Sequence, residues 1–406
     1  IRKTIAAIIA AAMLLGTAAG CSGTSSGEKP IVNTTSDIKR GSSHDPSIVE
    51  ADGKYYIFGS HRAWLKSDDL VNWESFTNNL STDYKKILGD FWEEWPKQPA
   101  NSDLTGNMWA PDVIYNKAMK KWCMYMSVNG INYKSAIVLL TADTIEGDWT
   151  LVGPVVYSGF RDDPVAKTDV PKVLGSSEVP TRYLSPGDTE INAIDPSVKY
   201  DDDGSLWMTF GSWFGGLWAL KLDASTGLRD YTTTYETAKD ETDQYYGIKI
   251  AGGHGNSGEG SYIMKQGDYW YLFVSYGALQ QQGGYQIREF RSKNITGPYV
   301  DEDGNNAVST ETIGSNWTLK TGIRLMGSVE WSGNDNANIE VAQGHNSAFV
   351  DEDGTAYVVY HTRFSNRNEE HEVRVRELLT TADGWLAAAP YEYTGVKANA
   401  KGYQES

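Results

Sequence analysis

Cysteine is almost absent from this chain, which has two among 406 residues. Cys21 follows an apolar leader and Cys123 lies in a segment rich in aromatic residues, so no intrachain disulfide is expected. We predict that Cys123 is a buried thiol of the core. The sequence also lacks paired-cysteine metal motifs, a glycine-rich phosphate loop with its lysine and a Gly-x-Ser-x-Gly elbow, which argues against the sites that those motifs mark.

Positive charge is scarce as well. The 36 Lys and Arg residues face 53 Asp and Glu, which gives a formal net charge of -17 and a pI near 4.8. A strongly acidic protein is repelled by phosphate backbones and anionic lipid, so we expect no nucleic-acid partner and no direct membrane surface. The charge fits a neutral or basic ligand, or simply a soluble exported protein acting as a monomer.

Only one long apolar run occurs, and it lies at the start of the sequence. Arg2 and Lys3 precede the apolar residues 5–15, and small residues then lead to Cys21. This pattern is typical of a bacterial lipoprotein signal over residues 1–20, with Cys21 as the lipidated residue. An ordinary signal peptide with an incidental cysteine is the alternative. Residues 21–40 are predicted to be a flexible linker, and the protein to be exported, either lipid-anchored at the cell envelope or secreted.

Long helical periodicity is missing between residues 41 and 394. Short strands rich in aromatic and β-branched residues recur instead, separated by turns such as Asp52-Gly53 and Asp203-Gly204. Five related double-strand units are typical of an all-β, five-bladed β-propeller with about four strands in each blade. Irregular spacing predicts longer inserts near 85–105, 160–192, 229–257 and 300–340. The last strands are expected at 373–378 and 386–393, followed by a tail at 395–406 that could begin a truncated domain.

Each unit begins with a related motif, a polar head followed by apolar residues. The five motifs are His44-Asp45-Pro46-Ser47, Trp109-Ala110-Pro111-Asp112, Ile194-Asp195-Pro196-Ser197, Gly258-Glu259-Gly260 and Gly344-His345-Asn346. Innermost propeller strands converge on an axis, so Asp45, Asp195 and Glu259 are predicted to meet there. Cleavage of a glycosidic bond uses two carboxyl groups placed across the sugar. A turn or capping role is the alternative for each Asp-Pro-Ser taken alone.

Taken together, these motifs resemble glycoside hydrolase family 43, whose members are five-bladed propellers that cleave arabinose- and xylose-containing polysaccharides with inversion. The resemblance implies that Asp45 is the general base and Glu259 the general acid. It also implies that Asp195 holds Glu259 in place and raises its pKa by like charge.

Softer patterns at 211–217, 275–277 and 384–391 resemble the endo-1,5-α-L-arabinanases, which implies arabinan or arabino-oligosaccharides as substrate. An exo-acting α-L-arabinofuranosidase or β-xylosidase of the same family stays open, as does a non-catalytic surface glycan-binding lipoprotein. The family resemblance further implies a structural or electrostatic calcium ion near the active site with His345 as its ligand. A core or hydrogen-bonding histidine is the alternative.

Aromatic and polar residues beside the motifs are candidates for substrate binding. Sugar rings present apolar faces to aromatic side chains, and on this ground we predict that Trp109, Trp213 and Tyr276 stack on substrate. His61 and Asn129 follow innermost-type strands and are predicted to bind hydroxyl groups, with a structural role as the alternative for each.

Overall fold

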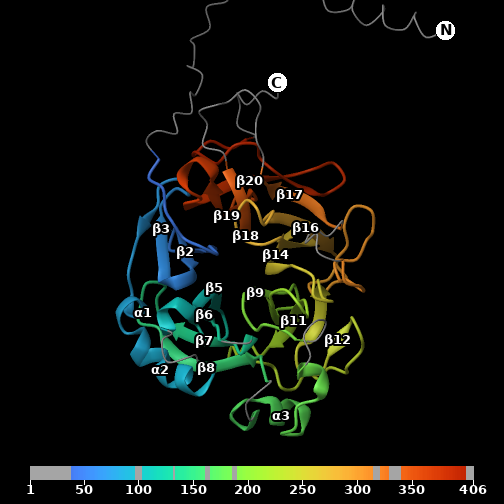
Figure 1. Cartoon of the computed structure of the whole chain (residues 1–406). Coiled ribbons are helices and arrows are strands. Elements are labelled where there is room, and N and C mark those ends of the chain that lie inside the picture. The colour runs from blue at the N-terminus through green and yellow to red at the C-terminus, as the bar shows by residue number, and fades with distance from the viewer. Residues whose placement is uncertain are drawn as a thin grey trace, which may run out of the picture. The chain divides into compact units, whose positions relative to one another are not determined.

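Five antiparallel sheets lie around a common centre in the computed structural model (Figure 1). The structure describes residues 38–96, 103–130, 133–160, 165–184, 190–313, 321–328 and 340–398. The predicted leader, Cys21 and most of the predicted linker lie outside these residues. The five-bladed β-propeller predicted from the repeats is confirmed.

Blades I and II have four strands each, paired in sequence order. Blade I consists of β1 (Ser47–Ala51), β2 (Lys54–Gly59), β3 (Ala63–Ser67) and β4 (Glu74–Ser75). Blade II consists of β5 (Met108–Asn116), β6 (Lys121–Val128), β7 (Ala136–Ala142) and β8 (Thr150–Tyr157).

Blade III has a fifth, two-residue strand at its edge, and blades IV and V return to four. Blade III runs β9 (Ser197–Tyr200), β10 (Leu206–Phe210), β11 (Leu217–Leu222), β13 (Gly247–Ala251) and β12 (Thr242–Asp243). Blade IV consists of β14 (Glu259–Gln266), β15 (Tyr269–Tyr276), β16 (Gln286–Ser292) and β17 (Ile323–Gly327). Blade V consists of β18 (Glu340–Val350), β19 (Ala356–Phe364), β20 (His371–Thr380) and β21 (Leu386–Ala388).

The core is divided among the junctions between neighbouring blades. In β6, Met124 and Met126 pack toward blade I, whereas Cys123 and Tyr125 pack toward blade III, because successive strand side chains point to opposite faces. Both faces of this sheet are therefore buried, which explains why every residue of β7 is buried and all but Thr141 are apolar. Cys123 is fully buried as predicted, and burial raises the pKa of its thiol to about 12.

Several inserts differ from the sequence prediction. The insert near 85–105 contains α2 (Tyr84–Glu94), which follows the one-turn α1 (Asn79–Thr82) and buries Leu88 and Trp92. The predicted inserts at 229–257 and 300–340 hold β13 and β17, the fourth strands of their blades. Long connections separate these strands from their partners, which hid them from the repeat pattern. The final strand β21 is also shorter than the predicted 386–393.

The remaining helices of the described residues are short and lie in connections between strands. They are α3 (Val170–Leu174) and the 3-10 helices η2 (Ser60–Arg62), η3 (Leu104–Asn107), η5 (Val165–Lys167), η6 (Thr181–Leu184) and η7 (Ser365–Arg367). Among the described residues, no helix combines the length and apolarity needed to cross a bilayer.

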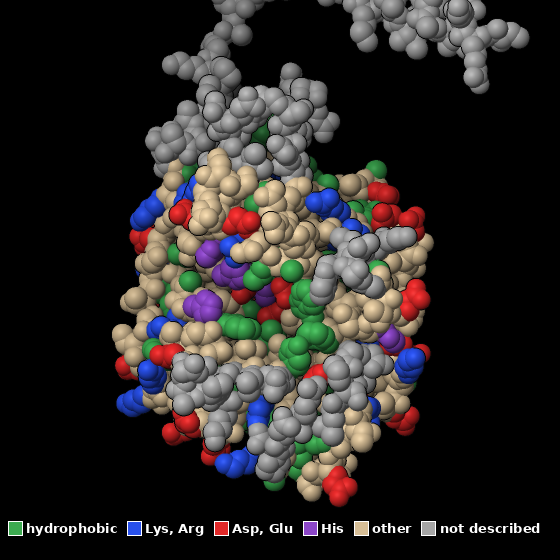
Figure 2. Space-filling model, viewed as in Figure 1, with side chains coloured by type: hydrophobic (Ala, Val, Ile, Leu, Met, Phe, Trp, Pro, Cys, Tyr) green, Lys and Arg blue, Asp and Glu red, His purple; other side chains and the backbone are tan. Residues whose placement is uncertain are grey.

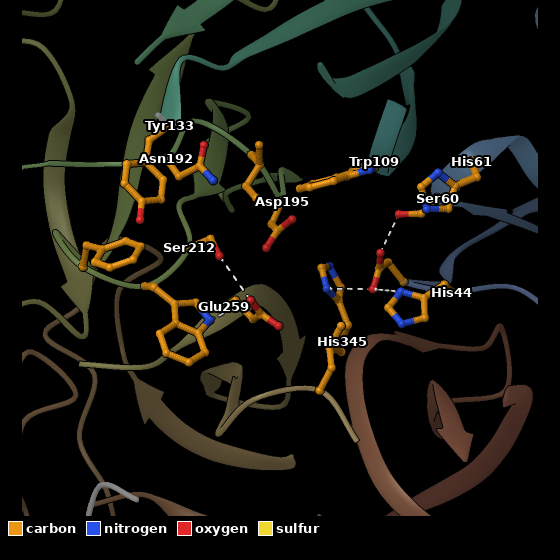
Figure 3. Close-up of a pocket in the computed structure, with 15 residues that line it drawn as sticks. His44, Ser60, His61, Trp109, Tyr133, Asn192, Asp195, Ser212, Glu259 and His345 are labelled. Atoms are coloured by element: carbon orange, nitrogen blue, oxygen red, sulfur yellow. Dashed lines mark hydrogen bonds and ion pairs between the residues drawn. The ribbon is translucent and has the colours of Figure 1, made fainter. Parts of the chain in front are cut away.

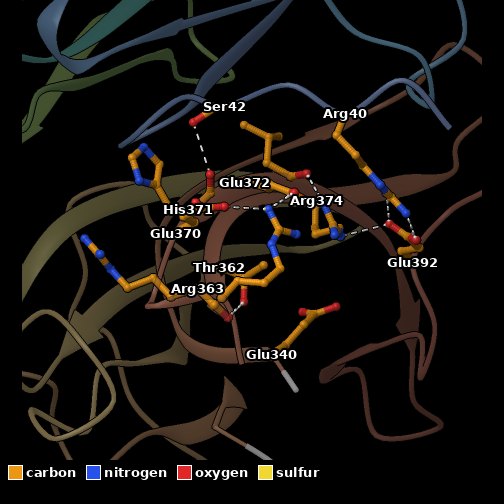
Figure 4. Close-up of polar contacts among 12 residues, drawn as sticks. Arg40, Ser42, Glu340, Thr362, Arg363, Glu370, His371, Glu372, Arg374 and Glu392 are labelled. Atoms are coloured by element: carbon orange, nitrogen blue, oxygen red, sulfur yellow. Dashed lines mark hydrogen bonds and ion pairs between the residues drawn. The ribbon is translucent and has the colours of Figure 1, made fainter. Parts of the chain in front are cut away.

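The ring closes where blade V meets blade I, and this junction is held without a shared strand. Ser347 Oγ donates to the carbonyl of Pro46 over 2.7 Å and accepts from the backbone N–H of Ile48 over 3.1 Å. On the outer side, the segment before β1 lies along β20, where the N–H of Val373 donates to Gly41 over 2.9 Å. Figure 4 shows the polar network there: Glu392 pairs with both Arg40 and Arg374. We call this junction the closing seam.

Candidate active site

A pocket of about 400 Å³ lies where the innermost strands converge. Its volume falls in the usual range for small-molecule sites, about 300 to 1,000 Å³. Acidic and histidine side chains gather in this hollow (Figure 2). The residues that line it are His44, Asp45, Ser60, His61, Trp109, Tyr133, Asn192, Ile194, Asp195, Ser212, Trp213, Phe214, Glu259, Leu279 and His345. The three predicted acids and His345 therefore share one pocket, although they come from four blades (Figure 3).

Asp45 is held by donors on both of its carboxylate oxygens. His44 Nδ1 and His345 Nδ1 lie 2.7 and 3.0 Å from Oδ1, and Ser60 Oγ donates to Oδ2 over 2.5 Å (Figure 3). Burial by itself would raise the pKa of Asp45, but the charges of His345 and His44 outweigh it and hold the pKa well below its usual value. Asp45 is therefore an ionised carboxylate with fixed orientation, which suits a base.

Asp195 is the most enclosed of the three acids, with 5% of its surface exposed. Its backbone N–H donates to Ser127 Oγ over 3.0 Å, and its Oδ2 accepts from the N–H of Gly260 over 3.2 Å. Burial raises the pKa of Asp195 to about 7, the negative charges of Glu259 and Asp45 act in the same direction, and His345 opposes them. A proton is thus retained among these carboxyl groups near neutral pH.

Glu259 accepts hydrogen bonds on both oxygens. Tyr285 Oη donates to Oε1 over 2.7 Å. The indole nitrogen of Trp213 and the hydroxyl of Ser212 donate to Oε2 over 2.8 and 3.2 Å. Three donors from blades III and IV thus fix the direction in which this carboxyl group faces the pocket.

The backbone is left-handed at the head of several innermost strands. Asp45, Asp195 and His345 have φ values of 55°, 59° and 45°, a region that side-chain-bearing residues seldom occupy. Each such residue costs on the order of 1–3 kcal/mol, and such conformations cluster at functional sites. In blade IV the left-handed residue is Gly260, with φ of 58°, where an added Cβ would lie 2.9 Å from Cγ of His345.

His345 lies among negative charges at the centre of the ring. Burial alone would lower its pKa, but Asp45 and Asp195 outweigh burial and raise the pKa to about 10. Three carboxyl groups around one imidazole make the hollow favourable for a cation, but His345 Nδ1 already faces Asp45. The residues fit a calcium ion only in part, because one imidazole nitrogen remains and most of the oxygen ligands that calcium prefers would be water.

Among the described residues, the group of three ligand-type side chains within 4.8 Å of one another is His44, Asp45 and His361. His44 and His361 are stacked, with ring centroids 4.0 Å apart and planes 27° apart. Lone pairs lie in the plane of an imidazole ring, so two nearly parallel rings do not direct them at one ion. This group is therefore better explained as a stack beside Asp45 than as a metal centre.

The substrate-binding predictions are only partly supported by position. Trp109, Trp213 and His61 line the pocket. Tyr276 does not: it is fully buried in the core between blades III and IV, so its predicted stacking role is wrong. The cause is strand alternation, because Ser275 faces blade V, where its Oγ accepts from the N–H of His345, and the next side chain must face the opposite way.

Asn129 also lies outside the pocket lining. Its Oδ1 lies 3.1 Å from Ser135 Oγ, and Ser135 Oγ donates to Asn192 Oδ1 over 2.6 Å. Asn192 is the amide that lines the pocket. Asn129 therefore supports Asn192 from behind, and a direct role in binding hydroxyl groups is not what the structure indicates.

Several site residues were missed by the sequence analysis. His44 and Asn192 lie within three residues of a predicted acid, and this proximity was the available signal. Ser60 directly precedes His61, which was predicted to bind substrate. Tyr285 gave no local signal, because its hydroxyl reaches Glu259 from a loop 26 residues further along the chain.

Carboxyl groups that share one pocket are the arrangement with which glycosidases cleave a glycosidic bond. The model of the family described as "Glycosyl hydrolases family 43" matches residues 34–169 and 162–386. The chain belongs to this family of glycoside hydrolases.

Relatives within the family include endo- and exo-acting enzymes. The chain is 36% identical over 377 residues to the extracellular endo-alpha-(1->5)-L-arabinanase 2 of Bacillus subtilis, covering 91% of this chain and 73% of that protein. It is 28% identical to an extracellular exo-alpha-(1->5)-L-arabinofuranosidase of Cellvibrio japonicus, covering 84% and 85%. A crystal structure of a family 43 glycoside hydrolase from Bacillus licheniformis superposes with a TM-score of 0.73 at 35% identity, covering 91% and 77%.

Proposed function

We propose that this protein is an inverting endo-1,5-α-L-arabinanase, which cleaves internal bonds of arabinan. The observation that carries the proposal is the placement of Asp45, Asp195 and Glu259 in one axial pocket, each held by a different set of donors. The higher identity to an endo-acting than to an exo-acting relative supports internal cleavage.

Asp45 is the general base in this mechanism. Its low pKa keeps it ionised, and the donors His44, His345 and Ser60 fix its oxygens in position to take a proton from water. In an inverting reaction the water attacks the face of the sugar opposite the leaving group, so base and acid lie on opposite sides of the bond. Asp45 and Glu259 belong to blades I and IV, which are not neighbours in the ring, and this separation supports the assignment.

Glu259 is the general acid that protonates the leaving oxygen. Burial, with the negative charges of Glu259 and Asp45, raises the pKa of Asp195 to about 7, so that a proton is retained beside Glu259 near neutral pH. Asp195 binds the N–H of Gly260, the residue after Glu259, and so also positions the acid through its backbone. Asp195 thus acts on Glu259 by both charge and geometry.

A calcium ion, if bound, would be held by His345 and would supply positive charge close to the acids. Replacement of His345 by Ala is expected to lower activity and leave the fold intact. Metal content measured by mass spectrometry after equilibration with Ca²⁺ should fall in the variant. Full activity together with unchanged metal content would show that the calcium assignment is wrong.

Release of reducing ends from linear arabinan tests the catalytic assignment. We expect Asp45→Asn and Glu259→Gln to lose at least about 100-fold in kcat, since each removes a proton-transfer step worth about 10²–10⁴-fold. Glu377→Gln is the matched control, because Glu377 is a buried acid of blade V outside the pocket. Wild-type rates in Glu259→Gln would disprove the mechanism. Proton NMR of the first product should show the inverted anomer.

Early product sizes separate endo from exo action. An endo enzyme releases mixed oligosaccharides first, whereas an exo-acting arabinofuranosidase, the activity named for the Cellvibrio relative, releases one short product throughout. A non-catalytic glycan-binding protein would release nothing and would bind arabinan equally well without its three acids.

The export assignment is part of the proposal. The leader ending at Cys21 supports a lipid anchor, and the Bacillus relative is named as extracellular. Cys21→Ser in the full chain is expected to move the protein from the membrane fraction to the medium. An unchanged membrane fraction would disprove lipidation at Cys21.

A further inference from the structure

Neighbouring blades are joined near the axis by a recurring hydrogen bond. A side chain at the end of a blade's second strand accepts from the backbone N–H at the head of the next blade's first strand. In three cases the acceptor is a serine: Ser60 for Ala110 at 2.8 Å, Ser127 for Asp195 at 3.0 Å and Ser275 for His345 at 2.7 Å. All three N–H groups belong to residues with positive φ. The bonds therefore hold the left-handed backbone in place.

Asp45 has a histidine where the others have serine. Its backbone N–H donates to Nδ1 of His361, in β19 of blade V, over 3.4 Å. Because Nδ1 accepts, the ring proton is on Nε2, and that atom is buried without a partner. An unpaired buried donor costs about 1–3 kcal/mol. A serine would avoid this cost, so stability alone does not explain the histidine.

An imidazole makes a contact at Asp45 that serine cannot make. The ring of His361 stacks on His44 with centroids 4.0 Å apart, and His371 meets His44 edge-on at 5.3 Å. His44 in turn pairs with Oδ1 of Asp45 over 2.7 Å. His361 thus contacts both the backbone of Asp45 and the ring that orients its carboxylate. Burial, followed by the charge of His44, holds the pKa of His361 well below its usual value, in keeping with a neutral acceptor.

We propose that His361 is a positioning residue for the general base: across the closing seam it fixes the left-handed backbone of Asp45 and the ring of His44 together. The inference rests on the proposed role of Asp45 as base. His361 does not line the pocket, so it acts through Asp45 and not on substrate.

Three substitutions separate positioning from space filling. His361→Ala removes both contacts, and a displacement of the base by about 1 Å is expected to lower kcat on linear arabinan up to about 100-fold, with KM changed less than about threefold. His361→Asn retains an acceptor bonded to Cγ, as in histidine. Its kcat is expected to be at least about tenfold higher than that of His361→Ala. His361→Gln is closer to histidine in volume but moves the acceptor one bond further out, and should recover less.

Val359→Ala is the control for a cavity in the same strand, since Val359 is fully buried and packs between blades V and I away from the pocket. It should retain wild-type kcat. Wild-type kcat in His361→Ala, or better recovery by Gln than by Asn, would overturn the positioning role. An active Asp45→Asn variant would instead overturn the assignment of the base itself, so the two failures are distinguishable.

Discussion

The indole nitrogen of Trp213 donates a hydrogen bond to Oε2 of Glu259 over 2.8 Å. Trp213 is predicted to stack on sugar through its ring face, and its polar edge contacts the proposed acid. Trp213→Phe keeps an aromatic ring and loses this bond. A hydrogen bond to an ionisable group contributes about 1.5–3 kcal/mol, so kcat should fall at least about tenfold. Steady-state kinetics on arabinan would measure this, with Trp385→Phe, outside the pocket, as an unaffected control.

Gly260 is predicted to be essential for space and not only for its conformation. Alanine there would place Cβ 2.9 Å from Cγ of His345 and displace that ring from Asp45. Gly267 has a nearly equal φ of 57° with open space around it, so Gly267→Ala carries the same backbone strain without the collision. Both variants should lose about 1–2 kcal/mol of stability in urea unfolding, and only Gly260→Ala should lose activity. Equal activity in the two would refute the steric explanation.

Tyr276 and Tyr285 provide an opposed pair of tests. The hydroxyl of Tyr276 is buried without a partner, whereas that of Tyr285 donates to Glu259. Tyr276→Phe should therefore keep full activity and gain up to about 1 kcal/mol in stability. Tyr285→Phe should lose activity. A thermal melt and a rate on arabinan for each variant decide the matter, and a loss of activity in Tyr276→Phe or full activity in Tyr285→Phe would contradict these expectations.

Glu289 is expected to make stability depend on pH. It is fully buried in β16, and burial raises its pKa from 4.5 to about 8. The folded state therefore holds a proton that the unfolded state releases above pH 4.5. The contribution of Glu289 to the free energy of unfolding is fully present below about pH 4.5. It is lost as the pH rises to about 8, by up to about 1.4 kcal/mol per pH unit.

Glu289→Gln should remove this dependence. The difference in unfolding free energy between the variant and wild type is then expected to grow in favour of the variant from pH 5 to pH 8. Urea titrations at four pH values would measure it. A difference that stays constant over this range would show that Glu289 is ionised in the folded protein.

Strand patterning predicted most of the fold. The Asp-Gly turns and aromatic strands predicted the hairpins, and β2 begins directly after the predicted Asp52-Gly53 turn. The pattern failed at β13 and β17, because their pairing depends on contacts that cross long connections. It also missed α2, whose two buried side chains, Leu88 and Trp92, are too few to give a clear helical stripe.

The acids could be predicted because each heads a repeated motif, whereas their partners could not. His361 reaches Asp45 from the second strand of blade V, across the closing seam, and Tyr285 reaches Glu259 from the connection between β15 and β16 of the same blade. Tyr276 lies beside a site residue in sequence and faces the other way in space. Proximity along a strand does not predict direction unless the inward face is known.

The closing seam separates Asp45, in blade I, from His345 and His361 in blade V. No peptide bond links the two sides of this junction locally, so thermal fluctuation can part them while every sheet stays paired within itself. On gradual heating, hydrolysis should therefore fail at a lower temperature than the loss of β-sheet signal in circular dichroism. Catalytic activity would then report whether blades V and I are in contact.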